Sequence, residues 1–206
     1  MDKDEKKKLL AELKAKMGKD YSLPLRKGTK NLVFGEGDIE AEVMFIGEGP
    51  GYWEDMKGRP FVGNAGALLG QALYSIKLSR EKVFITNVVH FRPPENRDPL
   101  PQEIEAFAPY LDKMIEIINP KVIVTLGRFS MAKFIPLAKI TAIHGRAQRV
   151  NWKDKAVVVV PMFHPAAGLR SEEVKRKFLE DFHNLVEVLK SVKEETVKKS
   201  EQMQLV

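Results

Sequence analysis

The chain has 206 residues, and its 44% of hydrophobic residues is enough to build one full core. It contains no cysteine, which excludes disulfide bridges, thiolate zinc sites and cysteine-ligated iron–sulfur clusters. The sequence shows no signal-peptide pattern and no apolar run long enough to cross a bilayer, so we expect a soluble, cytoplasmic protein that binds no membrane.

The formal charge of +6 is carried mainly by the start of the chain. Residues 1–30 contain ten Lys or Arg side chains against five Asp or Glu, a local excess of five positive charges. Such a basic arm is typical either of a segment that contacts nucleic acid or of a solvated lysine-rich helix. High lysine and glutamate content without cysteine favours a thermophilic source.

The first predicted element is a helix at residues 2–17, within a basic N-terminal unit that covers residues 1–19. A buried strand at residues 41–46 comes next, because its apolar residues run almost without interruption. A glycine-rich loop and a helix at residues 65–76 follow it. A second strand at residues 82–89 then leads into a proline-rich loop.

Pro101 begins the clearest amphipathic helix of the chain. A third buried strand at residues 121–126 and a fourth at residues 156–163 follow, with a short helix between them. Ser171 caps a last helix. We expect the charged segment 193–206 to be a disordered tail.

Strands that alternate with helices predict the α/β class, as a three-layer α/β/α sandwich around a mostly parallel, four-stranded central sheet. We expect residues 1–192 to form a single domain and the protein to be a monomer. The C-terminal residues 202–206 lack the paired aromatics of a sliding-clamp peptide, so the sequence does not support a clamp as a partner.

Three polar residues stand at the ends of predicted strands. Glu48 follows the first strand, Asn87 lies near the end of the second, and His164 follows the fourth. Because the carboxyl ends of parallel strands meet at one edge of a sheet, these side chains can share a pocket. The six glycines of residues 47–66 let the backbone approach a ligand, although neither a phosphate loop nor a dinucleotide fingerprint is present. The four histidines show no metal-ligand spacing, so we expect no metal site.

Several motifs, taken in chain order, carry a family resemblance. They are Gly47-Glu48-Gly49-Pro50-Gly51 with Glu54-Asp55, Gly58-Arg59-Pro60-Phe61-Val62-Gly63, Asn87, Arg92-Pro93-Pro94 with Asn96-Arg97, and His164-Pro165-Ala166. Over roughly residues 20–190 the chain resembles the uracil-DNA glycosylase superfamily, and most closely family 4, the type found in thermophilic bacteria and archaea. The resemblance implies a DNA repair enzyme whose partner is uracil-containing DNA.

One departure from family 4 concerns its cofactor. These enzymes usually hold a [4Fe–4S] cluster through four cysteines, and the corresponding positions here are Asp20, Leu23, Phe91 and Phe107. Because three of the four are apolar, we expect side-chain packing to replace the iron–sulfur cluster and the protein to need no cofactor.

The resemblance assigns three side chains to the extruded base. Phe61 would stack on it, although the residue could equally be a core aromatic. Asn87 matches the N3–H donor and O4 acceptor of uracil, although a lone Asn at a strand end is usually a turn former. His164 would donate a hydrogen bond to uracil O2, as a neutral or a protonated ring, against the alternative of a capping histidine.

A carboxylate is also needed, to stabilise the oxocarbenium-like sugar and hold the attacking water. Glu48 is the first catalytic candidate, and Glu54 competes with it. Other glycosylase families place an Asp where this chain has Gly49. We expect Gly49 to contact the substrate. Alternatively, Glu54 and Tyr52 would block the C5 methyl of thymine, while Asp55 would be a structural hydrogen-bond acceptor.

Contacts with DNA are expected from other loops. By the resemblance, Leu169 and Arg170 correspond to the segment that enters the minor groove, where an apolar wedge stabilises the extruded state. The residues expected near phosphates are Ser130, Lys133, His144, Arg146 and Arg170.

Two function classes follow from these residues. The first is a monofunctional glycosylase that releases uracil and leaves an abasic site, without strand cleavage because no catalytic lysine is evident. The second is a related protein that binds uracil or another damaged base with weak or no turnover. Product formation from uracil-containing DNA separates the two.

Overall fold

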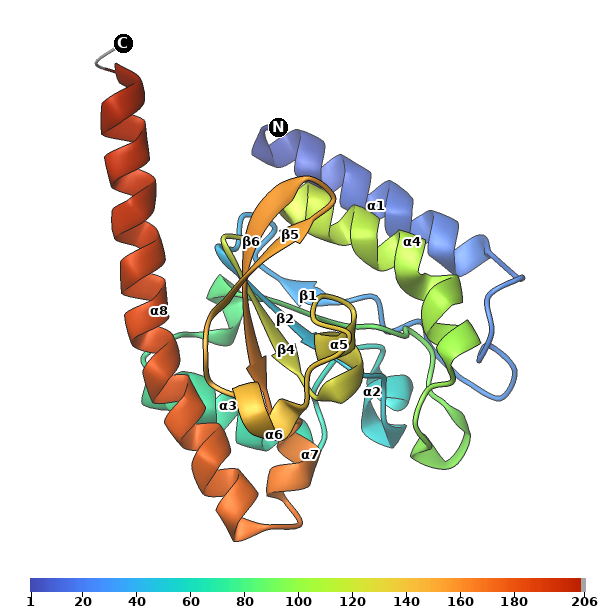
Figure 1. The fold of residues 1–206 in the computed structure, drawn as a ribbon. Helices are drawn as coiled ribbons and strands as arrows, with labels where there is room; N and C mark the ends of the chain where they lie inside the picture. The colour runs from blue at the N-terminus through green and yellow to red at the C-terminus, as the bar shows by residue number, and fades with distance from the viewer. Residues whose placement is uncertain (205–206) are drawn as a thin grey trace.

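A computed structural model describes residues 1–204, and its centre is a six-stranded sheet of order β1-β3-β2-β4-β6-β5 (Figure 1). The strands are β1 (Glu36–Gly37), β2 (Val43–Gly47), β3 (Phe84–Asn87), β4 (Val122–Leu126), β5 (Gln148–Trp152) and β6 (Lys155–Met162). The four predicted strands form the parallel centre, β3-β2-β4-β6, which confirms the α/β class and the mostly parallel sheet.

The predicted count of four strands was two short, because β1 and β5 add antiparallel edges. β1 has only two residues, too few to leave a hydrophobic pattern. β5 is polar and partly exposed, and a tight turn joins it to β6. Lys153 and Asp154 in that turn have φ of 48° and 62°, the left-handed values that two-residue hairpin turns require.

Helices cover both faces of the sheet, which confirms the three-layer architecture. α1 and α4 lie on one face, and α3 and α8 lie on the other (Figure 1). The helices are α1 (Lys3–Lys19), α2 (Tyr52–Lys57), α3 (Asn64–Ser75), α4 (Pro101–Ile118), α5 (Arg128–Ala132), α6 (Ile140–Ile143), α7 (Pro165–Gly168) and α8 (Glu172–Gln204), with 3-10 turns at Arg80–Lys82 and Pro94–Asn96. The described helices include none that combines the length and apolar character needed to cross a membrane.

β2 shows why the central strands are apolar throughout. Met44 and Ile46 pack into the hydrophobic core on the α1–α4 face. Val43 and Phe45 pack into the second core, on the α3–α8 face. Since successive side chains of a strand point to opposite faces, a strand covered on both sides needs apolar residues at every position.

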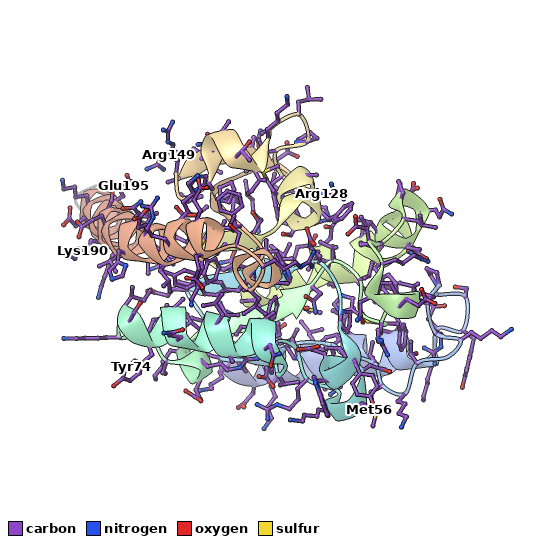
Figure 2. All side chains as sticks on the ribbon, turned by 90° about the horizontal axis from the view of Figure 1, so that it is seen from below. Met56, Tyr74, Arg128, Arg149, Lys190 and Glu195 are labelled. Atoms are coloured by element: carbon purple, nitrogen blue, oxygen red, sulfur yellow. The ribbon has the colours of Figure 1, made fainter. Side chains whose placement is uncertain are left out.

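α8 differs from the sequence expectation at its C-terminal end. We expected a disordered tail from residue 193, but the helix continues to Gln204 and extends beyond the body of the molecule (Figure 1). Its sequence contains no Gly or Pro and is rich in Lys and Glu, which are strong helix formers. Arg149 of β5 also pairs with Glu195 of α8, and Figure 2 shows the two side chains next to each other. Residues 205–206 of the expected tail lie outside the described residues.

Candidate active site

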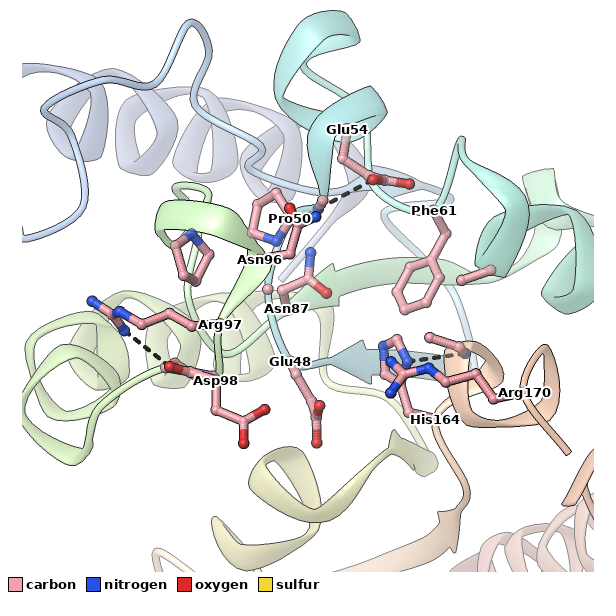
Figure 3. Close-up of a pocket in the computed structure, with 16 residues that line it drawn as sticks. Glu48, Pro50, Glu54, Phe61, Asn87, Asn96, Arg97, Asp98, His164 and Arg170 are labelled. Carbon is pink, nitrogen blue, oxygen red and sulfur yellow. Dashed lines mark hydrogen bonds between the residues drawn. The ribbon is translucent and has the colours of Figure 1, made fainter.

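The carboxyl edge of the parallel strands holds a cavity of about 310 Å³ (Figure 3). Its walls come from the segments that follow β2, β3 and β6, which are far apart in the sequence. Gly47 of β2 pairs with Asn87 of β3 in the sheet, so the first two of these segments begin side by side. The lining residues are Glu48, Gly49, Pro50, Gly51, Glu54, Phe61, Ala65, Asn87, Pro93, Asn96, Arg97, Asp98, Pro99, His164, Ala166 and Arg170.

Phe61 and Asn87 approach each other across Gly47. A Cβ atom on Gly47 would lie 2.5 Å from Cζ of Phe61 and 2.4 Å from Oδ1 of Asn87, closer than non-bonded atoms come. The Phe61 ring centroid lies 5.7 Å from that of His164. The absence of a side chain at Gly47 therefore lets an aromatic ring, an amide and an imidazole line one small space.

Asn87 ends β3 with its side chain buried, 1% exposed. Its Oδ1 atom has no hydrogen-bond partner among the described residues. A buried acceptor without a partner is costly unless a ligand or water supplies a donor. The structure therefore leaves this acceptor without a partner in a residue that lines the cavity.

His164 follows β6 and caps the short helix α7. Its Nδ1 accepts a hydrogen bond of 3.2 Å from the backbone N–H of Ala166, so this nitrogen carries no proton. Burial, together with the nearby Arg170 guanidinium, lowers the pKa of His164 to about 4. The ring is therefore neutral at pH 7, and its proton sits on Nε2, which makes Nε2 a hydrogen-bond donor.

Glu48 is held by the turn that begins α5. Its Oε1 accepts a hydrogen bond of 3.2 Å from the backbone N–H of Phe129. Burial raises the pKa of Glu48, and this N–H partly offsets that effect. Gly127 has φ of 103°, and a Cβ atom there would lie 2.3 Å from Glu48 Oε1, so the carboxylate needs glycine at this position.

Glu54, the competing carboxylate, is bonded to backbone N–H groups through both oxygens. Oε1 accepts from Val62 and from Gly63, each at 2.8 Å, and Oε2 accepts from Gly51 at 3.1 Å. All three donors belong to the loop segments on either side of α2. The side chain lines the cavity (Figure 3), but its charge is directed to these amides.

The remaining expected substrate contacts, Gly49 and Tyr52, differ in position. Gly49 lines the cavity. Tyr52 is 47% exposed and is not among the lining residues. Its ring contacts the edge of Trp53, with centroids 5.2 Å apart, and the Arg92 guanidinium lies 5.2 Å from its centroid.

The residues expected to contact DNA separate into two groups. Arg170 lines the cavity and is exposed, and Leu169 next to it is 51% exposed. Arg146 is exposed as well. In contrast, Ser130 is fully buried and its hydroxyl donates to the carbonyl of Gly127.

The other two candidates in this set are bonded to carboxylates. Lys133 is largely buried and forms an ion pair with Asp112. His144 contacts both carboxylate oxygens of the buried Asp181 through Nδ1, at 2.9 Å each. Lys133, like the buried Ser130 described above, therefore has its polar group engaged within the protein and is not available to a DNA strand.

The loop after β3 contributed to the family resemblance but was not expected to form part of the site, yet its residues 96–99 line the cavity. Glu95 and Asn96 both have left-handed backbone conformations, with φ of 55° and 56°. Arg97 donates to both oxygens of Glu103, at 2.8 and 2.6 Å, which fixes the loop to α4. The signal in the sequence was the high proline content of this loop.

Three of the four positions expected to correspond to the family 4 cysteines, Leu23, Phe91 and Phe107, are buried in the core on the α1–α4 face. The Phe91 and Phe107 rings lie 6.1 Å apart, and both residues are buried with Leu23 in one core. The Tyr110 hydroxyl donates to Asp20 at 2.6 Å. The described residues contain no group of three or more His, Cys, Asp or Glu that could hold a metal ion. These side chains do not fit an iron–sulfur cluster, because they supply no thiolate and fill the space themselves.

Comparison with known proteins gives concordant matches. The sequence model of the uracil DNA glycosylase superfamily matches residues 34–189. A type-4 uracil-DNA glycosylase of Sulfurisphaera tokodaii is 47% identical over 174 residues, which are 81% of this chain and 79% of that protein. The type-4 enzyme of Archaeoglobus fulgidus is 44% identical over 80% of this chain and 85% of its own. That of Thermotoga maritima is 40% identical over 90% and 97%. These organisms agree with the thermophilic character expected from the composition.

Proposed function

The chain belongs to the uracil-DNA glycosylase superfamily, and from this premise we propose that it removes uracil from DNA as a monofunctional glycosylase. The enzyme flips the deoxyuridine out of the DNA, hydrolyses its N-glycosidic bond and leaves an abasic site in an uncut strand. That the chain is a uracil-DNA glycosylase of DNA repair rests on relatives with 40–47% identity over most of its length. The steps of the reaction rest on the geometry of the cavity.

Asn87 recognises the base. Its buried Oδ1 lacks a partner among the described residues, and N3–H of uracil supplies the donor that this atom needs. The Nδ2 group of the same amide donates to O4. Cytosine presents an acceptor at N3 and a donor at position 4, so it mismatches this orientation of the amide.

His164 stabilises the departing base. Negative charge develops on uracil O2 as the glycosidic bond breaks, and the neutral ring offers its Nε2–H as a donor. Because Ala166 N–H fixes the ring orientation, the donor is in place before the reaction starts. Phe61 supplies the surface on which the base stacks between these groups.

Glu48 serves the sugar and the attacking water. Its carboxylate lines the cavity and is anchored at one oxygen by Phe129 N–H. A negative charge there favours the oxocarbenium-like sugar of the transition state, and the carboxylate accepts a proton from the water that attacks C1′.

One observation carries this proposal: Phe61, Asn87 and His164, which are far apart in the sequence, line a single cavity. The test is a uracil-containing oligonucleotide that is incubated with the protein and analysed on a gel with and without alkali. We expect strand breaks only after alkali, no product from Asn87→Ala, and a rate loss on the order of 10²–10³-fold in His164→Ala.

Two other outcomes of this assay have defined meanings. Strand breaks before alkali would contradict the monofunctional route. Tight binding of the oligonucleotide by the wild-type protein with no alkali-labile product would contradict the glycosylase proposal and support a base-binding protein.

A further inference from the structure

We propose that Glu54 is a positioning residue whose carboxylate holds the backbone of Phe61, so that the ring can stack on the base. This inference deepens the proposed function and rests on it. It replaces the sequence-based expectation that Glu54 takes part in the chemistry or, with Tyr52, excludes thymine.

The hydrogen bonds of Glu54 connect the residue before α2 with the C-terminal end of the loop that contains Phe61. Gly51 precedes α2, and Gly63 precedes α3, so the carboxylate bridges the N-termini of two helices. It also accepts from Val62, the residue directly after Phe61. A negative charge is stabilised at the N-terminus of a helix, because the backbone N–H groups there have no partner within the helix and point toward the charge.

Phe61 needs this support because its backbone is strained. Its φ is 50°, in the left-handed region that residues with a Cβ atom rarely adopt. A Cβ atom on Gly66 would lie only 1.9 Å from the Phe61 carbonyl oxygen, so α3 packs directly against this peptide. The Arg80 guanidinium donates to the carbonyl of Pro60, the residue before Phe61. The peptide groups before and after Phe61 are therefore both held, and Glu54 supplies the hydrogen bonds that follow the strained residue.

The same bonds explain why a direct chemical role is disfavoured. Both oxygens of Glu54 already accept hydrogen bonds from backbone N–H groups, whereas Glu48 is held through Oε1 by the turn that begins α5. Tyr52, the other half of the expected thymine barrier, does not line the cavity. Glu54 therefore acts on the substrate through Phe61.

A double-mutant cycle tests this dependence, with single-turnover rates of uracil release and apparent affinities for uracil-containing DNA measured for each variant. We expect Glu54→Ala and Phe61→Ala each to slow release by roughly 10- to 100-fold. The double variant should be no slower than the slower single variant, because the second change removes nothing that remains functional. Effects that multiply in the double variant would overturn the proposal, as would the loss of the acid limb of the pH–rate profile in Glu54→Ala.

Asp55→Ala is the matched control. Asp55 lies on the same helix and accepts two backbone N–H bonds, at 2.8 and 3.0 Å, from Lys30 and Asn31 rather than from the Phe61 loop. It should lower thermal stability without coupling to Phe61. Glu54→Gln keeps an oxygen that can accept from Val62 and Gly63, so we expect it to recover most of the rate lost in Glu54→Ala. Uracil release in Glu54→Gln that is as slow as in Glu54→Ala would count against the positioning role.

Hydrogen exchange separates this inference from the proposed function. The amides of Val62 and Gly63 should exchange slowly in the wild-type protein and quickly in Glu54→Ala, while amides of the central strands are unchanged. This result would support positioning even if the wild-type protein released no uracil, an outcome that would refute the glycosylase proposal alone. Unchanged exchange at both amides would refute the positioning role. Should Glu54→Ala fail to fold, the same exchange comparison is made with Glu54→Gln, where the amide of Gly51 should lose protection.

Discussion

At the scale of single residues, burial shifts the pKa values of two ionisable groups of the cavity in opposite directions. The pKa of His164 falls to about 4, so the ring stays neutral, and the pKa of Glu48 rises from its ordinary value of 4.5. In each case the environment disfavours the charged form. For Glu48 the charged form is the one that the proposed mechanism requires.

The first prediction concerns the pH dependence of uracil release. Because the pKa of Glu48 is raised, the active carboxylate is lost as pH falls through a value above 4.5, and the rate should fall with it. His164, with a pKa of about 4, should add no limb near pH 6.5. The measurement is the single-turnover rate between pH 4 and 8. In Glu48→Gln the remaining slow rate should lack this acid limb, and its persistence would contradict the role of Glu48.

The second prediction compares two glycines. Gly47→Ala places a Cβ atom 2.4 Å from Asn87 Oδ1 and 2.5 Å from the Phe61 ring, so we expect uracil release to be lost. Gly70→Ala, in the middle of α3, meets no atom within 4 Å and should leave the rate unchanged. It should also raise stability by roughly 0.5–1 kcal/mol, because alanine favours a helix. Activity assays and urea unfolding check both variants, and an active Gly47→Ala would contradict the described cavity.

At the scale of elements, the sequence predicted the parts of the fold whose residues carry a repeating pattern. The four central strands were found because each is apolar on both faces, and Pro101 marked the start of α4. The edge strands were missed because β1 is very short and β5 is polar. α8 was cut short because its charged end resembles a disordered tail, although its residues are good helix formers.

The residues of the site also divide into those that the sequence could predict and those that it could not. Glu48, Asn87 and His164 could be predicted from their places at strand ends, because sheet topology alone brings such positions together. The bonds of Glu54 could not, since they join its side chain to backbone groups up to nine residues away. The burial of Ser130 and the ion pair of Lys133 likewise depend on tertiary packing that no local pattern records.

The third prediction concerns the packed residues Leu23, Phe91 and Phe107, which we expect to stand where family 4 has cysteines. Phe107 is fully buried between α4 and the rest of this core, so Phe107→Ala should lower the free energy of unfolding by about 3–5 kcal/mol. The matched expectation is that protein produced in iron-depleted medium has the same melting temperature and activity as protein produced with iron. A loss of either property on iron depletion would show that packing is not what holds these segments.

At the scale of the whole molecule, the arrangement suits a DNA strand that approaches the carboxyl edge of the sheet. The cavity lies there with Arg170 in its lining (Figure 3), and the neighbouring Leu169 is exposed. α1, which carries many of the basic residues, packs beside α4 on one face of the sheet (Figure 1). We therefore propose that DNA contact depends on a few loop residues more than on the net charge of +6.

The fourth prediction follows for Arg170. If its guanidinium neutralises a phosphate, Arg170→Ala should weaken DNA binding and reduce the slope of log K against log salt by about 1. Arg149→Ala is the control, since Arg149 pairs with Glu195 on α8 and lies outside the cavity lining. Fluorescence anisotropy over a salt series gives both slopes, and equal slopes for the two variants would contradict the contact.

A titration with free uracil, followed by NMR of the labelled protein, tests the central claim most directly. We predict that the side-chain amide of Asn87 and the ring nitrogens of His164 shift together along one binding curve, while the amide of Gly70 does not. Phe61→Ala should weaken that curve, and cytosine should produce none. Uracil that shifts only one of the two side chains, or neither, would contradict a shared pocket for the extruded base.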